Sequence, residues 1–264
     1  MRLSYHNHTN MSDGDVSLEE MIEAARQAGI DEFGISDHYC LYPGGRPIEW
    51  SMPVVLLDEY VERIRMVAAE TQSPIIRLGL EADYFPETIE QIQEIVAVHP
   101  FDYLIGSVHF VDDFPIDTDA GDWEAISPPE RDEVWRLYWI RLKQMAESRA
   151  FDIVAHPDLP KKFGYLPSID LEEEEQAALD AIAASGMSIE INTAGWYKPA
   201  AEMYPSLRLL REASRRNIPL QVNVDSHHPN TISRDYDRAA SLAREIGYTK
   251  VVGYERRQRL TVPL

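Results

Sequence analysis

The sequence has little cysteine, few basic residues and no long apolar run, and each shortage excludes a class of protein. Cys40 is the only cysteine among 264 residues, so neither an internal disulfide nor a cysteine-based zinc site can form. No stretch approaches the ~20 apolar residues of a membrane span, and the N-terminus lacks the apolar run of a signal peptide. We therefore expect a cytoplasmic protein with no membrane partner, and leave monomer and homo-oligomer both open.

The charge balance is strongly acidic, with 25 Lys and Arg against 45 Asp and Glu and a formal net charge of −20. Binding to nucleic acid needs a basic patch, and the one short basic cluster, residues 256–259, lies near the C-terminus. We expect no nucleic-acid partner. A small phosphorylated metabolite is compatible with the acidity, because divalent ions create a local positive site.

Several common catalytic motifs are also missing. The chain contains no glycine-rich GxGxxG or GxxxxGK[ST] phosphate loop and no GxSxG nucleophile motif. Cys40 has no neighbouring group that would activate its thiolate. These absences argue against a nucleotide-binding loop and against hydrolysis by a serine or cysteine nucleophile.

The segments that are present alternate between strand and helix seven times, with no repeat and no Gly/Ser-rich linker. We expect strands over residues 3–6, 32–36, 75–80, 102–107, 151–155, 187–191 and 220–224, and a short strand over 250–252. We expect helices over residues 17–28, 53–70, 87–98, 128–149, 170–185, 206–216 and 235–246. Such alternation predicts an α/β fold with a parallel sheet, most simply a closed or nearly closed barrel over residues 1–264 as one domain.

One segment does not fit this alternation. Residues 111–127 contain six acidic side chains and no clear period, and we interpret them as a surface excursion. The alternative is a lid over the site, because long loops beside barrel sites often serve that way.

Ligand-type side chains collect at the predicted strand ends. His6 and His8 are two residues apart on an extended backbone, so they point to the same side, and Asp13 follows. The later strand ends contribute Asp37, His38, Glu81, His109, His156, Asp225 and His227. Imidazoles with carboxylates suit zinc, manganese or iron, and nine candidate ligands, with Asp37 set aside as an orienting residue, suit two or three divalent ions.

The motifs around these side chains resemble those of the polymerase and histidinol phosphatase (PHP) superfamily along essentially the whole chain. In chain order they are His6-x-His8-Thr-x-x-Ser-Asp13-Gly, Ser36-Asp-His38, Gly79-Leu-Glu81-Ala-Asp, Gly106-Ser-Val-His109, Ala155-His-Pro-Asp158 and Asp225-Ser-His227. Residues 101–109, 156–164 and 190–199 resemble the histidinol-phosphate phosphatases of that superfamily.

The resemblance implies a distorted TIM-like (β/α)7 barrel with a trinuclear metal centre. The first ion would be held by His6, His8, Glu81 and Asp225. The second would be held by Glu81, His109 and His156, and the third by Asp13, His38 and His227. The implied reaction is hydrolysis of L-histidinol phosphate in histidine biosynthesis, in which Glu81, Asp225 and His109 act through a metal-activated hydroxide.

One position departs from the pattern. Tyr197 stands where many histidinol phosphatases have an arginine, which would grip phosphate with two hydrogen bonds. Lys161, Lys162 or Lys198 could compensate as point charges. Asn192 either faces the substrate or caps the following loop.

Three further residues have side chains of the types found in such sites. Asp158 either protonates the leaving group or has a structural role in a turn. We expect neither His99 nor His228 to be a metal ligand.

Three other functions share parts of this pattern. A PHP phosphoesterase could act on another small phosphorylated metabolite or on a nucleotide. A metal-dependent amidohydrolase or deaminase is also built around His-x-His, but no lysine lies at a predicted strand end here. A non-catalytic metal-binding module would have no need of the complete ligand set.

Overall fold

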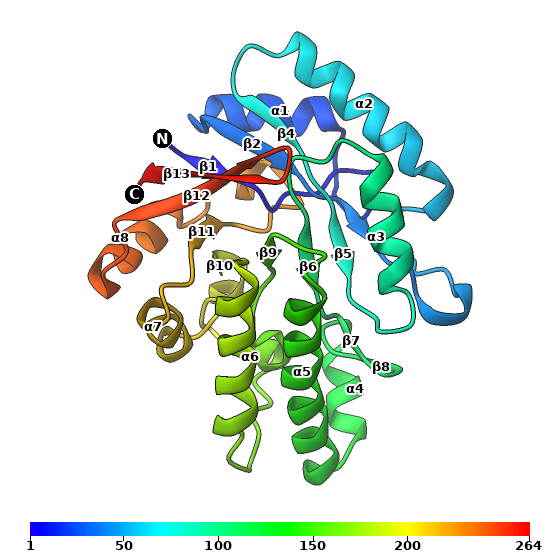
Figure 1. The fold of residues 1–264 in the computed structure, drawn as a ribbon, viewed down its shortest axis with the longest axis vertical. Helices are drawn as coiled ribbons and strands as arrows, with labels where there is room; N and C mark the ends of the chain where they lie inside the picture. Colours follow the sequence, from blue (N-terminus) through cyan, green and yellow to red (C-terminus); the bar gives the residue numbers. More distant parts are fainter.

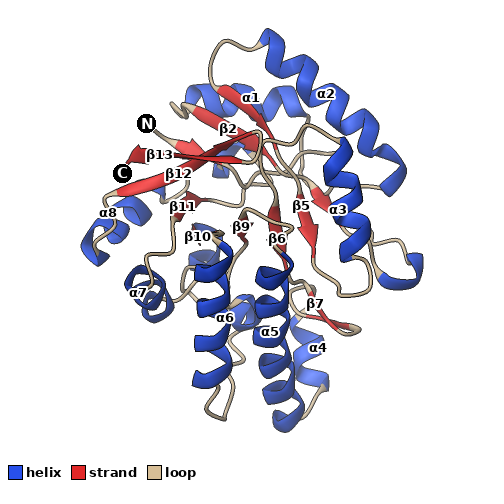
Figure 2. Ribbon diagram, viewed as in Figure 1, coloured by secondary structure: helices blue, strands red, loops and turns tan.

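The computed structural model describes residues 1–264 and shows strands surrounded by helices (Figures 1 and 2). The helices are α1 (Leu18–Gln27), α2 (Leu57–Glu70), α3 (Ile89–Val98), α4 (Ala120–Ala125), α5 (Pro128–Ser148), α6 (Glu172–Ser185), α7 (Leu207–Arg215) and α8 (Tyr236–Ile246). The strands of the parallel sheets are β1 (Leu3–Ser4), β2 (Glu32–Ile35), β3 (His38–Tyr39), β4 (Ile75–Leu78), β5 (Glu81–Asp83), β6 (Ile105–Ser107), β9 (Ile153–Val154), β10 (Ser188–Asn192) and β11 (Leu220–Asn223). The predicted α/β fold with parallel strands is confirmed.

The parallel strands form two sheets, in the orders β1-β2-β4 and β11-β10-β9-β6-β5-β3. The chain passes directly from β2 into β3 and from β4 into β5, so the two sheets meet at these breaks. An isolated parallel bridge between Asn7 and Ser226 joins the end of β1 to the segment after β11, and His8 N donates to Ser226 O at 2.9 Å. Residues that follow β1 and β11 are therefore neighbours, although 219 positions separate them in sequence (226 minus 7).

A tyrosine hydroxyl stands at the break between the sheets. Tyr60 of α2 is fully buried, accepts a hydrogen bond from Asp37 N and donates one to Gly79 O at 2.9 Å. These bonds satisfy backbone groups at the break, where unpaired polar groups would be costly. The chain can therefore turn its next residues, which begin β3 and β5, toward the centre of the molecule.

The core beneath the breaks is closely packed. Sixty-five buried apolar residues form one cluster, and the Tyr103 ring lies in it directly over Gly34 and Gly79. A Cβ atom on Gly79 would lie 2.1 Å from the Tyr103 ring, far inside van der Waals contact. Only glycine fits here, two residues before Glu81.

Helix starts follow the signals in the sequence. Ser17 and Glu20 form a capping box at the start of α1, with both reciprocal hydrogen bonds present. Ser127 and Glu130 form the same arrangement at the start of α5. None of the helices is both long enough and apolar enough to cross a membrane.

Residues 111–127, which we interpreted as a surface excursion, expose many side chains but form regular elements. The segment continues an antiparallel hairpin of β7 (Phe110–Val111) with β8 (Phe114–Pro115) and then forms α4. Trp123 of α4 is fully buried and its Nε1 donates to Ile116 O at 2.8 Å. The apolar side chains between the acids anchor the segment against the core.

The predicted short strand at 250–252 is longer than expected. β12 (Lys250–Glu255) pairs with β13 (Gln258–Pro263) in an antiparallel hairpin.

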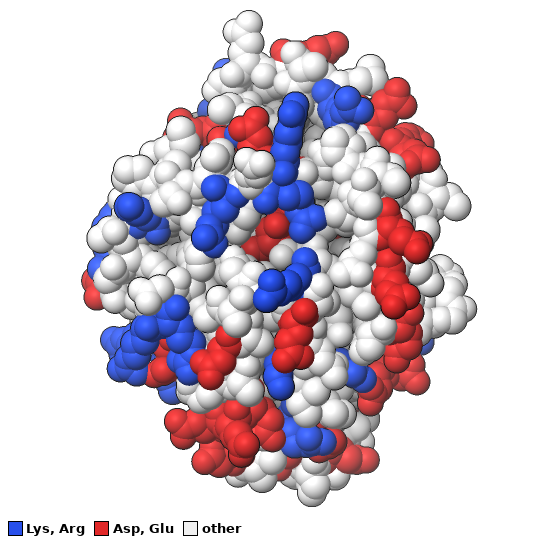
Figure 3. All heavy atoms as spheres, viewed as in Figure 1, with Lys and Arg blue, Asp and Glu red and all other residues white.

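On the face drawn in Figure 3, Lys and Arg side chains form separate groups divided by acidic and uncharged atoms.

We expect Gly79→Ala to lower the free energy of unfolding by about 1–3 kcal/mol, the usual range for an overpacked core. The new methyl group would overlap the Tyr103 ring. Urea denaturation of the variant and of Gly79→Ala combined with Tyr103→Leu would measure the effect, since the smaller Leu should restore part of the loss. An unchanged midpoint for Gly79→Ala alone would contradict this packing.

Candidate metal centre

All nine predicted ligands meet at the ends of the parallel strands. They fall into four overlapping groups, in each of which one potential ligand atom per residue lies within 4.8 Å of the others. The groups are His8, Asp13, His38 and His227; His6, His8 and Glu81; His6, His156 and Asp225; and His38, Glu81 and His109. Because the groups share members, they form one continuous cluster.

Glu81 lies at the middle of this cluster and is fully buried. Its Oε2 lies 3.0 Å from His6 Nε2 and 2.8 Å from His38 Nδ1. Its Oε1 lies 3.0 Å from His156 Nε2 and 3.6 Å from His109 Nε2. His8 Nε2 also lies 3.6 Å from Oε2. One carboxylate thus faces five imidazoles, three at Oε2 and two at Oε1, and could bridge two ions.

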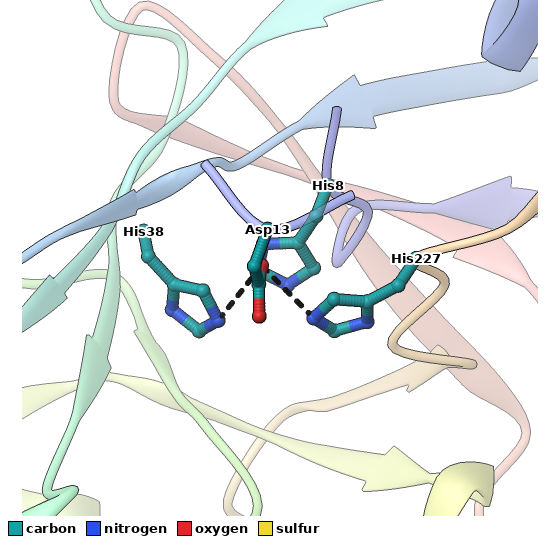
Figure 4. Close-up of side chains that lie close together, drawn as sticks. All are labelled: His8, Asp13, His38 and His227. Carbon is teal, nitrogen blue, oxygen red and sulfur yellow. Dashed lines mark ion pairs between the residues drawn. The ribbon is translucent and has the colours of Figure 1, made fainter. Parts of the chain in front are cut away.

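Asp13 occupies the outer side of the cluster, between two histidines (Figure 4). Its Oδ1 lies 3.3 Å from His227 Nε2 and 3.7 Å from His38 Nε2. The His8 ring stacks between the same two histidines, with centroid distances of 4.2 Å to His38 and 4.1 Å to His227. Asp225 Oδ1 approaches His8 Nε2 at 3.2 Å, which joins this group to the inner one.

The chemistry of this donor set fits divalent ions. Seven of its buried side-chain atoms have no hydrogen-bond partner, and five of these lie within ion-pair distance of another member of the set: His6 Nε2, His8 Nε2, His38 Nδ1, Glu81 Oε2 and Asp225 Oδ1. Several are within ion-pair distance of one another but lack hydrogen-bond geometry. A buried polar atom left unpaired costs about 1–3 kcal/mol, and coordination to a shared cation would satisfy all five.

Two further buried carboxylates, which we did not predict as site residues, hold ligand rings from behind. Both Glu190 oxygens lie 3.1 Å from His6 Nδ1, and Glu190 Oε1 also accepts from His156 N at 2.8 Å. Asp83 Oδ1 lies 3.0 Å from His109 Nδ1. Such carboxylates fix the orientation of a ligand imidazole and increase its basicity. The sequence does give a sign that Glu190 is functional, because it is an acidic residue between two isoleucines of strand β10.

Asp37 has a related role at the loop that carries Asp13. It accepts hydrogen bonds from Thr9 N at 2.7 Å, Thr9 Oγ1 at 2.8 Å and Ser12 Oγ at 2.6 Å. Burial raises its pKa to about 6, although these hydrogen bonds oppose the shift. Asp37 is outside the four groups, so it supports the loop instead of facing the centre.

The pKa values show how strongly the carboxylates act on the histidines. Burial disfavours the charged form of His109, but Asp83 and other carboxylates outweigh it and raise the pKa to about 10. Burial likewise opposes Asp13 and Asp225 at His227, whose pKa rises to about 9. His8 differs, because burial and the neighbouring His227 lower its pKa to about 3. Without metal, protons therefore occupy part of the centre at neutral pH.

A cavity of about 470 Å³ opens onto the centre. Asp13, His109, Asp225 and His227 form part of its wall. Its other charged lining residues are Asp117, Lys162, Lys198 and Arg234, and its aromatic lining includes Trp50 and Tyr204. The cavity thus combines the metal-ligand side chains with three cationic ones.

Only two of the predicted substrate contacts line this cavity. They are Lys162, whose Nζ donates to Asp117 O at 2.6 Å, and Lys198. Asn192 instead caps the following turn, since its Oδ1 accepts from Ala194 N at 3.0 Å, and its Nδ2 donates to Asp225 Oδ2 at 3.1 Å. Tyr197 is 56% exposed and points its hydroxyl at Asp235.

Lys161 and Asp158 form a buried pair away from the cavity. Lys161 Nζ donates to Asp158 Oδ2 at 3.0 Å, Glu202 Oε2 at 2.9 Å and Met203 O at 2.7 Å. Asp158 Oδ2 also accepts from Ser206 N at 2.8 Å. This network gives both residues a structural role in joining two loops.

Neither of the histidines that we set aside joins the metal-ligand groups. His99 lies at the surface, 3.4 Å from Asp58, and His228 lines the cavity while accepting a hydrogen bond from Asn230 N. Arg234, Trp50 and Asp117 line the cavity without having been predicted, because they belong to no motif.

Comparison with known proteins gives consistent matches. The family model for the PHP domain matches residues 4–194. A probable histidinol-phosphatase of Deinococcus radiodurans is 34% identical over 237 residues, 86% of each chain. A probable histidinol-phosphatase of Schizosaccharomyces pombe is 25% identical over 97% of this chain and 90% of that protein. The crystal structure of a histidinol phosphate phosphatase from Lactococcus lactis, with zinc, L-histidinol and phosphate, superposes with a TM-score of 0.83, 23% identity and 98% coverage of both chains.

Zinc binding to the metal-free protein should release protons at pH 7.5, because metal and proton compete for the nitrogens of His6, His109 and His227, whose pKa values are all raised. Metal affinity should rise with pH through the pKa values near 9 and 10. Titration calorimetry in buffers of different ionisation enthalpy measures the release, and His227→Gln should reduce it. A heat that is independent of the buffer would contradict this protonation state.

Glu190→Gln should weaken metal binding roughly 10- to 100-fold, because the amide orients and polarises His6 less well than the carboxylate. Competition with a coloured chelator measures the affinity. Glu175→Gln is a matched control, since Glu175 is also buried but pairs with Arg208 on another face. Equal affinities for the two variants would refute the supporting role of Glu190.

Proposed function

Because the chain belongs to the PHP domain family, we propose that it is a metal-dependent phosphomonoesterase that hydrolyses L-histidinol phosphate to L-histidinol and phosphate. The observation that carries the proposal is the buried Glu81, which faces five histidines beside a cavity that cationic side chains also line. The names of the similar proteins support the choice of substrate.

We propose as ligands the nine residues of the cluster, divided among two or three ions of zinc, manganese or iron. In this division Glu81 bridges two sites. His6, His8 and Asp225 complete the first site, and His109 and His156 complete the second. Asp13, His38 and His227 form the third site. The zinc in the Lactococcus structure and the four overlapping groups support this assignment.

Bound divalent ions would supply an activated water and neutralise charge on the phosphoryl oxygens. In the reaction a water oxygen bonds to phosphorus, the ester P–O bond breaks, and a proton passes to the departing histidinol oxygen. The residues of the chain fix the geometry: Glu190 and Asp83 orient the His6 and His109 rings, and Lys198 places positive charge on the cavity wall. The cavity is large enough for a phosphorylated amino alcohol.

We also infer that the two parallel sheets act as one distorted (β/α)7 barrel and that residues 1–264 are a single domain. The direct passage of β2 into β3 and of β4 into β5 supports this inference. The Asn7–Ser226 bridge supports it on the other side. In such a barrel the cluster lies at the carboxyl ends of the strands, the usual place for catalysis.

His109→Ala and Asp225→Asn should each lower kcat/KM by about 100-fold or more, because metal ions supply several kcal/mol of transition-state stabilisation. Release of phosphate from L-histidinol phosphate by zinc- or manganese-loaded protein measures the loss. His99→Ala, which changes a surface histidine outside the cluster, should keep full activity. Full activity in both cluster variants would show that the metal centre takes no part in the reaction.

The substrate is tested on the same metal-loaded protein with a panel of phosphomonoesters and one phosphodiester. We expect L-histidinol phosphate to be hydrolysed with a far higher kcat/KM than the other esters. Preference for another ester would keep the reaction class and overturn the substrate. If the metal-replete protein cleaves nothing in the panel, the proposed activity is wrong.

A further inference from the structure

Arg234 differs from the well-paired arginines of this chain because it faces the cavity without an acidic partner. It lies between the short helix η5 (Pro229–Thr231) and α8, and its side chain lines the same cavity as Asp225 and His227. No carboxylate lies within ion-pair distance of it, and its Nε is buried without a hydrogen-bond partner. By contrast, Arg77, Arg208 and Arg257 each pair with a carboxylate.

The guanidinium is held by an aromatic ring instead of a charge. Arg234 Cζ lies 4.0 Å from the centroid of the Tyr197 ring. The Tyr197 hydroxyl donates to Asp235, which keeps the ring in place. The Arg234 carbonyl accepts a hydrogen bond from Thr193 Oγ1 at 2.9 Å, so the backbone is fixed to the same turn as Tyr197. Stacking on its face leaves the N–H groups at the edge of the guanidinium available for a ligand.

Two lysines place further positive charge close to Arg234. Lys162 and Lys198 line the same cavity. Burial lowers the pKa of Lys198, and the nearby charges of Lys162 and Arg234 lower it further. Lys162 is paired with Asp117 Oδ2 at 3.2 Å, so Lys198 and Arg234 are the lysine and arginine of the cavity lining that have no carboxylate partner, and together they form a site for a dianion.

We propose that Arg234, together with Lys198, binds the phosphoryl group of the substrate, and that Tyr197 is the platform that positions the guanidinium. This inference rests on the proposed phosphomonoesterase function and names the residues that select its anionic group. A planar guanidinium can donate two parallel hydrogen bonds to phosphate oxygens, while the ammonium of Lys198 acts as a point charge. Tyr197 contributes through Arg234 and need not touch the substrate.

The test compares Arg234→Gln with Arg238→Gln. Arg238 is the matched control, because its guanidinium stacks on Trp196 at 3.8 Å but is exposed and does not line the cavity. Titration calorimetry with inorganic phosphate and zinc-loaded protein should show binding about tenfold weaker or more in Arg234→Gln, and unchanged binding in Arg238→Gln. Metal content and thermal midpoint are measured on each variant to confirm that the centre and fold are intact.

The position of the contact is tested by kinetics. KM should rise by a similar factor for L-histidinol phosphate and for p-nitrophenyl phosphate, since the two share only the phosphoryl group. Arg234→Lys should recover part of the loss, Tyr197→Phe should keep most of the affinity, and Tyr197→Ala should resemble Arg234→Gln in KM.

Phosphate binding separates this inference from the proposed substrate. If L-histidinol phosphate is inert but phosphate binding weakens in Arg234→Gln alone, Arg234 keeps its role and only the substrate is wrong. Equal phosphate affinity in Arg234→Gln and the unaltered protein overturns the inference, even if L-histidinol phosphate is the substrate. A rise in KM for L-histidinol phosphate but not for p-nitrophenyl phosphate overturns it too.

Discussion

The structure depends on one electrostatic constraint: the Glu81 carboxylate is fully buried and faces five histidines. A charge in such a place is costly unless cations or hydrogen bonds compensate it. Several nearby atoms lack hydrogen-bond partners, so the protein alone does not complete the site. The cluster lies where the sheets break, and Gly79 and Tyr103 fit together closely at that point. The break between the sheets is therefore the place where the cluster forms, and the proposed metal ions would complete it.

Around this cluster, other carboxylates orient the ligand side chains and the loop that carries one of them. Glu190 and Asp83 hold two ligand rings, and Asp37 holds the loop that carries Asp13. Positively charged side chains line the same cavity, because Lys198 and Arg234 have no carboxylate partner there. A substrate that contacts both the cluster and these cations needs oxygens that bind metal and also accept hydrogen bonds, which describes a phosphomonoester. Function thus follows from a cluster of potential metal ligands and unpaired cations that line one cavity.

The fold class and the cluster were predictable because they depend on local and periodic signals. Alternating strands and helices predicted the parallel sheets, and strand ends predicted every one of the nine clustered residues. The hairpin of β12 and β13 was missed because its turn uses Arg256 and Arg257 at positive φ (49° and 64°), with no glycine or asparagine to signal it. Arg234 was missed for another reason: the direction of its side chain depends on the Tyr197 ring, 37 positions earlier in the chain (234 minus 197).

The most direct test of this account is a crystal structure of the zinc-loaded protein with anomalous scattering measured at the zinc edge. The account predicts adjacent zinc peaks on both sides of the Glu81 carboxylate, with ligand atoms of His6, His38, His109 and His156 about 2.0–2.2 Å from the nearest ion. Zinc bound only at surface carboxylates, with the Glu81 cluster free of anomalous signal, would contradict it.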